Sequence, residues 1–281
     1  MSKPNNLEKI RHSLSHLLAA AVLEKYPNAK LGIGPVVEDG FYYDFLLPAK
    51  ISDADFPSLE KRISELIKEN LVFTIRKVAP AAAKKLFAKQ PFKLELIDEL
   101  KKSRQQITVY ETGHVFTDLC AGPHVKNTKE IPPDGFKLWK VAGAYWRGDE
   151  KREMLTRVYG LAFSSKKELD EKIKLLAEAE KRDHRKLGAQ LGLFIFSDLV
   201  GPGLPLYTPK GTLLRKLIAD YSRRLREEMG YQEVHTPQIN KAELFKRSGH
   251  YDQYRDSMFR VSSNYSDEEY FLKPMNCPQH T

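Results

Sequence analysis

Residues 7–26 read LEKIRHSLSHLLAAAVLEKY, and this stretch decides how the first half of the chain folds. Its apolar residues recur at helical spacing on one side and continue on the other: Ile10, Leu14, Leu17 and Ala21, then Ala19, Ala20 and Leu23. A helix that is apolar nearly all round is buried. His12 and His16, four residues apart within it, are therefore expected to face an enclosed space and to need polar partners there.

A second pair of chemically capable side chains follows about a hundred residues later, in DLCAGPH, residues 118–124. Pro123 disfavours helix at Gly122, so Cys120 and His124 are expected at a corner where a short strand enters a loop. Asp118 and His124 flank the cysteine at a distance of two and four residues. An acid and a base so close can set the charge state of a thiol.

Each pair alone has an ordinary structural explanation. Buried histidines often bond to backbone carbonyls, and a buried cysteine often acts as a small apolar side chain. Two such pairs in a chain with only two cysteines favour a pocket where imidazoles and a thiol converge. Metal binding and proton-transfer chemistry on a bound substrate both suit such a pocket.

The composition sets the broad class of the protein. A chain of 281 residues with 41% hydrophobic residues is expected to form about two domains. Two cysteines build no disulfide framework, which favours the cytoplasm. The apolar run 17–23 is too short to span a membrane or to serve as a signal core. The net charge of +9 favours an anionic partner, of which nucleic acid is the commonest.

Residues 1–164 show helix and strand patterns that do not alternate strictly. Glu38-Asp39-Gly40 between β-rich runs predicts a hairpin. Helices are expected at 56–70, 80–90 and 93–102, and strands at 71–78, 107–110, 136–145 and 155–163. This order predicts an α+β domain with an antiparallel sheet and one buried helix.

The later residues differ in pattern. Ser165 and Glu168 form a capping box, which predicts a linker helix over 165–190. A third segment, 191–281, contains the turn-rich GPGLPLYTPKG at 201–211, followed by an amphipathic helix over 212–229 that Gly230 ends. Residues 231–237 predict a strand stopped by proline, and a further strand is expected to end in FLKPMNCPQHT.

These motifs together resemble the threonyl-tRNA synthetases, a family of class II aminoacyl-tRNA synthetases. RHSLSHLLAAAV, LGIGPVVEDGFYYDF and DLCAGPHV are similar to the editing domain of that family. GPGLPLYTPKG, GYQEVHTP, SGHYDQY and LKPMNCP are similar to the opening of its antiparallel catalytic domain. The resemblance covers essentially the whole chain, and the ordered series of motifs is more specific than either pair of side chains.

The resemblance implies roles for particular residues. His12, His16, Cys120 and His124 are expected to line a pocket that hydrolyses wrongly made seryl-tRNA. Asp118 matches the acidic residue before the cysteine, Lys93 matches a pocket lysine, and Tyr42 or Tyr43 is expected to line the pocket. Cys120 is open to three roles, as nucleophile, water-orienting group or metal ligand, and water orientation is favoured. Related alanyl-type editing domains bind zinc with such a set, whereas the threonyl type is expected to work without it.

The resemblance also implies cofactors and partners for a full-length enzyme: ATP, zinc, threonine, threonine-specific tRNA and, through residues 211–237, a second copy of the chain. Cys277 matches the first of three zinc ligands. The two histidines that complete that site, and the ATP-binding arginines, are expected beyond Thr281. The chain is thus expected to be a fragment with a complete editing site and an incomplete synthetic site.

Two other functions stay open at this point. One is a free-standing or zinc-dependent hydrolase that edits tRNA charged elsewhere, although such an enzyme has no use for the class II motifs. The other is a non-catalytic module for tRNA binding or dimerisation, against which the intact set of pocket residues argues.

Overall fold

The structure is a computed structural model that describes residues 5–280. Residues 1–4 and 281, the outer ends of the expected domains 1–164 and 191–281, lie outside the described residues. The chain divides into two compact units, with the boundary between Arg182 and Asp183.

The first unit contains the elements that the sequence predicts, each within a few residues of its expected bounds. Its helices are α1 (Asn6–Lys25), α2 (Phe56–Lys68), α3 (Pro80–Leu86), α4 (Pro91–Lys102) and α5 (Lys166–Lys181). Its strands are β1 (Lys30–Leu31), β2 (Val36–Val37), β3 (Gly40–Leu46), β4 (Phe73–Lys77), β5 (Thr108–Thr112), β6 (Phe116–Leu119), β7 (Phe136–Tyr145) and β8 (Met154–Ala162).

These strands form two antiparallel sheets. One runs in the order β1-β3-β8-β7, with β2 also paired to β3 across the predicted hairpin, and the other runs β4-β5-β6. All strand pairs within the described part of this unit are antiparallel. The α+β class with an antiparallel sheet is therefore confirmed.

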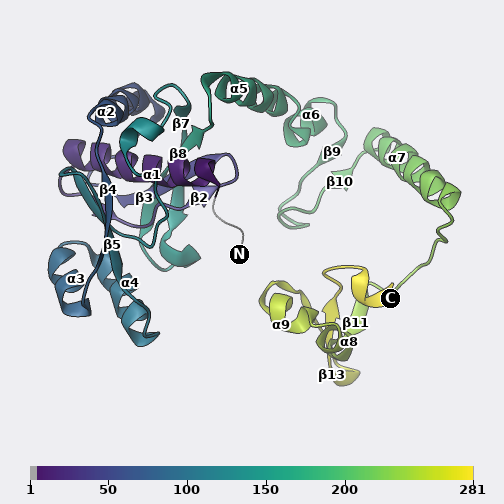
Figure 1. The fold of residues 1–281 in the computed structure, drawn as a ribbon. Helices are drawn as coiled ribbons and strands as arrows, with labels where there is room; N and C mark the ends of the chain where they lie inside the picture. Colours follow the sequence, from purple (N-terminus) through teal and green to yellow (C-terminus); the bar gives the residue numbers. More distant parts are fainter. Residues whose placement is uncertain (1–4, 281) are drawn as a thin grey trace. The chain divides into compact units, whose positions relative to one another are not determined.

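Helix α1 is the centre of the core, as its sequence predicts. It contacts β3 and α2 and also reaches β6 and β8 (Figure 1). Leu17, Leu18 and Val22 have no exposed surface. Because side chains alternate along a strand, Phe41, Tyr43 and Phe45 share the face of β3 that belongs to the same core. Each fully buried side chain of this size contributes about 1.5–3 kcal/mol, so α1 is held firmly.

The second unit contains one long helix and several shorter elements. Its helices are α6 (His184–Gln190), α7 (Pro209–Glu228), α8 (Ala242–Arg247) and α9 (His250–Tyr254). Its strands are β9 (Phe194–Ile195), β10 (Leu206–Tyr207), β11 (Ile239–Lys241), β12 (Arg260–Ser263) and β13 (Ser266–Leu272), paired as β10-β9 and as β11-β13-β12. Gly230, with φ at +87°, follows the end of α7 as predicted.

Two expectations for the later residues are wrong. The linker is two helices, because the Asp183 carboxylate accepts the N–H of Arg185 at 2.8 Å and caps a new helix, α6. Residues 231–237 form no strand in the described chain, where β11 pairs with β13 instead. A β-rich segment becomes a strand only with a hydrogen-bonded neighbour, which propensity alone does not supply.

The amphipathic helix α7 carries its apolar side chains exposed. Leu213, Leu217, Ile218 and Tyr221 each have more than half of their surface exposed.

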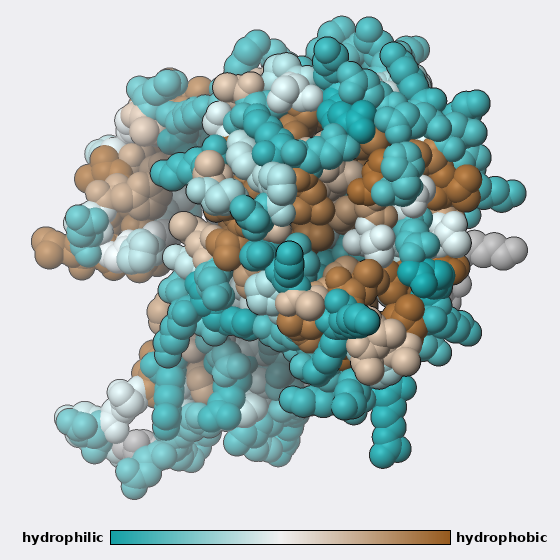
Figure 2. Space-filling model, turned by 90° about the vertical axis from the view of Figure 1, so that its left-hand side faces the viewer, coloured by the Kyte–Doolittle hydropathy of each residue, from teal (hydrophilic) through white to brown (hydrophobic). Residues whose placement is uncertain are grey.

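On the face drawn in Figure 2, apolar residues form separate patches between hydrophilic ones. None of the helices within residues 5–280 is long and apolar enough to cross a membrane.

Candidate active site

The loop that follows β6 places Cys120 at the predicted strand-to-loop corner. The Cys120 N–H donates to the Thr108 carbonyl at 3.2 Å, and the Thr108 hydroxyl donates to the Cys120 carbonyl at 2.7 Å. Gly122 has φ at +71°, and a Cβ there would lie 2.5 Å from the Tyr110 hydroxyl oxygen. Only glycine fits this close turn, which fixes the cysteine against α1.

The four predicted side chains from the two pairs meet at this corner. Cys120 Sγ lies 3.3 Å from His12 Nε2 and 3.3 Å from His124 Nε2. The His124 ring stacks on His12, with centroids 4.1 Å apart, and lies 4.2 Å from the ring of His16. One nitrogen or sulfur atom from each of the four lies within 4.8 Å of the others.

Burial favours the neutral forms of the three histidines and of Cys120. Burial lowers the pKa of His124 to about 2 and the pKa of His16 well below its usual value, and it also lowers the pKa of His12. Burial raises the pKa of the Cys120 thiol to about 12. His16 and His124 therefore stay neutral near neutral pH, because desolvation disfavours their charged forms.

A buried ion pair lies beside the imidazoles. Lys93, which is 1% exposed, places its Nζ 2.5 Å from Asp118 Oδ1. Tyr43 donates its hydroxyl to Asp118 Oδ2 at 2.6 Å, and His16 Nε2 lies 3.8 Å from the same oxygen. Asp118 therefore balances the lysine and orients the tyrosine, and its described bonds do not include Cys120.

The alternative of Tyr42 or Tyr43 is decided by the alternation of β3. Tyr43 is fully buried beside Asp118, and burial together with that carboxylate raises its pKa well above the usual value. Tyr42 lies on the opposite face, where its ring packs 3.9 Å from the guanidinium carbon of Arg157, which is bound to Asp44 at 2.7 and 2.8 Å. Tyr42 therefore belongs to the outer face of the sheet.

Sequence reasoning missed Ser13. This residue has no exposed surface, and its hydroxyl lies 3.1 Å from His124 Nδ1 and 3.1 Å from the backbone nitrogen of Val125. The available signal was a serine next to His12 on a helix without a solvent-facing side, where a hydroxyl needs a partner.

Two cavities in the first unit reach the cluster. One, of about 400 Å³, is lined by Cys120 and Ala121 together with residues of α4. The other, of about 580 Å³, is lined by His12, Gly122 and Pro123. Both have the size of small-molecule sites, and their linings include Cys120 in one and His12 in the other.

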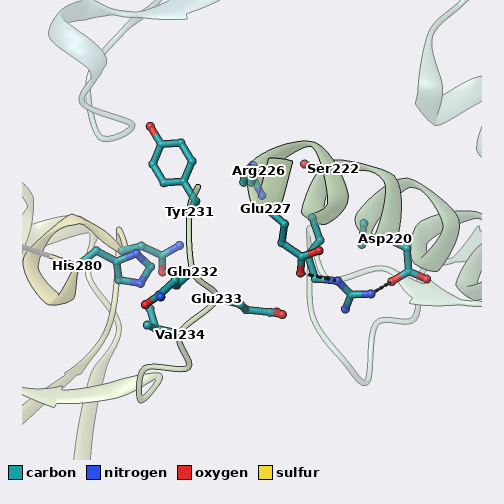
Figure 3. A pocket seen from close by; sticks show the side chains of 12 residues that line it. Asp220, Ser222, Arg226, Glu227, Tyr231, Gln232, Glu233, Val234 and His280 are labelled. Atoms are coloured by element: carbon teal, nitrogen blue, oxygen red, sulfur yellow. Dashed lines mark hydrogen bonds and ion pairs between the residues drawn. The ribbon is translucent and has the colours of Figure 1, made fainter. Parts of the chain in front are cut away.

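A groove of the second unit contains none of the residues predicted for the editing pocket. Figure 3 shows Asp220, Arg226 and Glu227 of α7 along this groove, which measures about 570 Å³ and includes His280. Arg223 pairs with Asp220 at 3.0 Å and with Glu227 at 3.8 Å. Its lining charges are thus partly paired with each other, and we assign the groove no chemistry.

Cys277 lies exposed in the short 3-10 helix Cys277–Gln279. Among residues 5–280, the groups of three or more His, Cys, Asp or Glu side chains able to hold a metal do not include it. The role of Cys277 as a zinc ligand stays a prediction.

Part of the first unit is similar to a domain found in aminoacyl-tRNA synthetases. Residues 107–159, which include Cys120 and His124, match the family described as the threonyl and alanyl tRNA synthetase second additional domain.

The particular relatives are proteins named "Threonine--tRNA ligase". The protein from Gloeobacter violaceus is 47% identical over 286 residues, which cover 99% of this chain and 45% of that protein. Those from Thermotoga maritima and Dehalococcoides mccartyi strain CBDB1 are 45% and 47% identical over 283 and 280 residues, covering 100% and 99% of this chain. The chain is therefore related to the threonyl-tRNA synthetases along its whole length, and it spans 43–47% of the length of these three relatives.

Among solved structures, the RNA binding domain of threonyl-tRNA synthetase from Cryptosporidium parvum Iowa II is 41% identical to the part that aligns. That part covers 35% of this chain and 24% of the other, with a TM-score of 0.33.

Proposed function

We propose that residues 1–164 form an editing domain that hydrolyses the ester bond of seryl-tRNA made in error by a threonine–tRNA ligase. The observation that carries this proposal is the meeting of His12, His16, Cys120 and His124 beside the buried pair of Lys93 and Asp118. Two accessible cavities and the relatives with their common name support it.

Hydrolysis of an ester needs a positioned water, an acceptor for its proton and stabilisation of the oxyanion. His12 is the best acceptor, since its ring is partly exposed and its Nδ1 lies 3.2 Å from the Pro123 carbonyl. A carbonyl only accepts hydrogen bonds, so Nδ1 carries the proton and the Nε2 lone pair faces the Cys120 thiol, 3.3 Å away. A water that takes the place of the thiol at Nε2 can give its proton to His12. Lys93, buried and paired with Asp118, lies beside the imidazoles and holds this side of the site in place.

Cys120 acts in this proposal by orienting water and not by covalent attack. A thiol attacks as its thiolate, and the pKa of this thiol, raised to about 12 by burial, keeps it protonated near neutral pH. Its sulfur lies between two imidazoles and also accepts the N–H of Gly122 at 3.2 Å. A polar, fixed thiol of this kind suits a water-directing group.

A zinc-dependent hydrolase is the second candidate. His12, His16, Cys120 and His124 would hold the metal, because three imidazoles and a thiolate are a set that zinc accepts, and His16 Nδ1 is buried with no hydrogen-bond partner among residues 5–280. When bound, zinc would supply a polarised water. Metal analysis of the wild type and of Cys120→Ser tests this: one zinc per chain that is lost in the variant supports the second candidate and contradicts the metal-free proposal.

The need for such a site follows from the size of the two amino acids. Serine lacks one methyl group of threonine, and a missing methylene is worth only about 1–3 kcal/mol in binding, so a second, hydrolytic selection is useful.

For the whole enzyme we propose that ATP, threonine and threonine-specific tRNA are the substrates and that Cys277 is one of the ligands of a zinc ion. We also propose that the whole enzyme is a homodimer and that it works in the cytoplasm.

The experiment is a deacylation assay without ATP. The chain is incubated with seryl-tRNA and with threonyl-tRNA, both made on threonine-specific tRNA. We expect seryl-tRNA to lose its amino acid far faster than in buffer, while threonyl-tRNA is spared. Loss of neither amino acid contradicts an editing hydrolase, and equal loss of both contradicts selection against serine.

A further inference from the structure

For each hydrogen bond of the Ser13 hydroxyl, the identity of the neighbouring atoms determines which partner donates the proton. The Val125 N–H is a donor only, so at 3.1 Å it donates to the Ser13 hydroxyl oxygen. The hydroxyl proton is then free for one acceptor. Of the bonds that this hydroxyl makes within residues 5–280, the remaining one leads to His124 Nδ1, at 3.1 Å. His124 Nδ1 is therefore an acceptor, and the neutral ring carries its proton on Nε2.

The opposite end of the cluster agrees with this assignment. His12 Nδ1 donates to the Pro123 carbonyl, so His12 Nε2 is an acceptor and receives the single thiol proton of Cys120. Sγ then has no proton left for His124, and the contact of 3.3 Å between Sγ and His124 Nε2 requires the proton to come from His124. Both ends thus assign the Nε2–H form to His124.

We propose that Ser13 is a positioning residue whose hydroxyl holds His124 in its Nε2–H form and so directs the thiol proton of Cys120 toward His12. This inference rests on the proposed function. Ser13 has no exposed surface and does not line either cavity, so it acts through the two imidazoles and the thiol and not through the substrate.

Without the hydroxyl, His124 Nδ1 loses its donor. The ring can then carry its proton on Nδ1, and its Nε2 competes with His12 Nε2 for the thiol proton. Removing a group that fixes the tautomer of a functional imidazole through its second nitrogen typically lowers activity by about 10–100-fold. We therefore expect Ser13→Ala to lower kcat for seryl-tRNA deacylation by about this factor, with KM little changed.

The decisive measurement is the protonation of the His124 ring nitrogens, by NMR of the full chain labelled with ¹⁵N-histidine. His124 signals are assigned by their loss in His124→Gln. The wild type is expected to show the proton on Nε2, and Ser13→Ala is expected to show a measurable fraction of it on Nδ1. A wild-type proton on Nδ1 overturns the proposal without any variant, and so does an unchanged Nε2–H form in folded Ser13→Ala.

The matched control is Ser15→Ala. Ser15 is equally buried on α1, but its hydroxyl bonds to the carbonyl oxygens of Gly34 at 2.9 Å and His12 at 2.8 Å and to neither imidazole. It should leave the His124 signals and the deacylation rate close to those of the wild type. Ser13→Thr, which keeps the hydroxyl, should restore the Nε2–H form and much of the rate.

The two proposals fail in different ways. A wild type that does not deacylate seryl-tRNA contradicts the proposed function, while the NMR result still decides the role of Ser13 on the imidazole. An active wild type whose rate is the same in Ser13→Ala overturns the positioning role alone.

Discussion

At the scale of single residues, burial determines the chemistry of the site more than neighbouring charges do. His124 and His16 lie against Phe73 and Phe116, with ring centroids 5.0 and 5.3 Å apart. Such surroundings cannot solvate an imidazolium, so the rings stay neutral. The same desolvation keeps the Cys120 thiol protonated. In the proposed mechanism His12 accepts a proton from water once that water replaces the thiol at Nε2.

This burial predicts how stability depends on pH. Below about pH 6.5 the histidines of the unfolded chain bind protons that folded His124, with its pKa near 2, does not bind. The unfolded state then holds more protons, so the free energy of unfolding falls as pH falls, by up to about 1.4 kcal/mol per pH unit for each such histidine. The thiol acts oppositely: the unfolded thiol ionises near 9.0 and the folded thiol near 12, so stability falls above that lower value.

Urea unfolding between about pH 5 and about pH 10 measures this dependence. We expect the highest stability between about pH 7 and about pH 9. The exposed His114 supplies a control, since His114→Ala should keep the acid slope, whereas His124→Phe should reduce it. Stability that stays constant or rises from pH 7 down to pH 5 would contradict neutral, buried imidazoles.

At the scale of secondary-structure elements, the ion pair of Lys93 and Asp118 joins α4 to β6 inside the protein. Asp118→Ala leaves the lysine ammonium buried without its partner, and breaking such a pair costs about 3–5 kcal/mol of unfolding free energy. The double variant Lys93→Met/Asp118→Leu should be more stable than Asp118→Ala, because it removes both charges.

Urea unfolding also checks this prediction. Asp98 on α4 offers a matched control, since its pair with Lys84 is 2.5 Å long but exposed to solvent. Asp98→Ala should therefore change stability little. An Asp118→Ala protein as stable as the wild type would show that the pair does not hold the two elements together.

Much at this scale could be predicted from the sequence, for physical reasons that differ between elements. The period of α1 identified a buried helix, and Gly122-Pro123 identified the loop at Cys120. Side chains alternate along β3, so only one of Tyr42 and Tyr43 can face the core. The sequence analysis left this choice open.

Other features were beyond the sequence because they depend on contacts formed in space. The break between α5 and α6 depends on which backbone N–H the Asp183 side chain binds. The missing strand at 231–237 depends on the absence of a pairing neighbour within the described residues. The lowered pKa of His124 and the role of Ser13 depend on packing between α1 and the loop after β6, segments about a hundred residues apart.

At the scale of the whole molecule, the net charge of +9 predicts how tRNA binds. Contacts between Lys or Arg and phosphates release counterions, so affinity falls as salt rises. Two such contacts already lower affinity about tenfold between about 50 and about 200 mM salt. Filter binding or fluorescence anisotropy with threonine-specific tRNA measures this slope. An affinity that does not change with salt would contradict binding through phosphates.

The central claim is that the cluster of His12, His16, Cys120 and His124 hydrolyses the aminoacyl ester, and the deacylation rate of its variants tests this claim most directly. His12→Ala and Cys120→Ala are each compared with a variant of the same residue type outside the cluster, His114→Ala and Cys277→Ala, under single-turnover conditions with seryl-tRNA. We expect the cluster variants to lose at least ~10²-fold in rate, as for lost proton-transfer or water-positioning groups, and both controls to match the wild type. If His12→Ala and Cys120→Ala hydrolyse seryl-tRNA at the wild-type rate, the cluster is not the hydrolytic site.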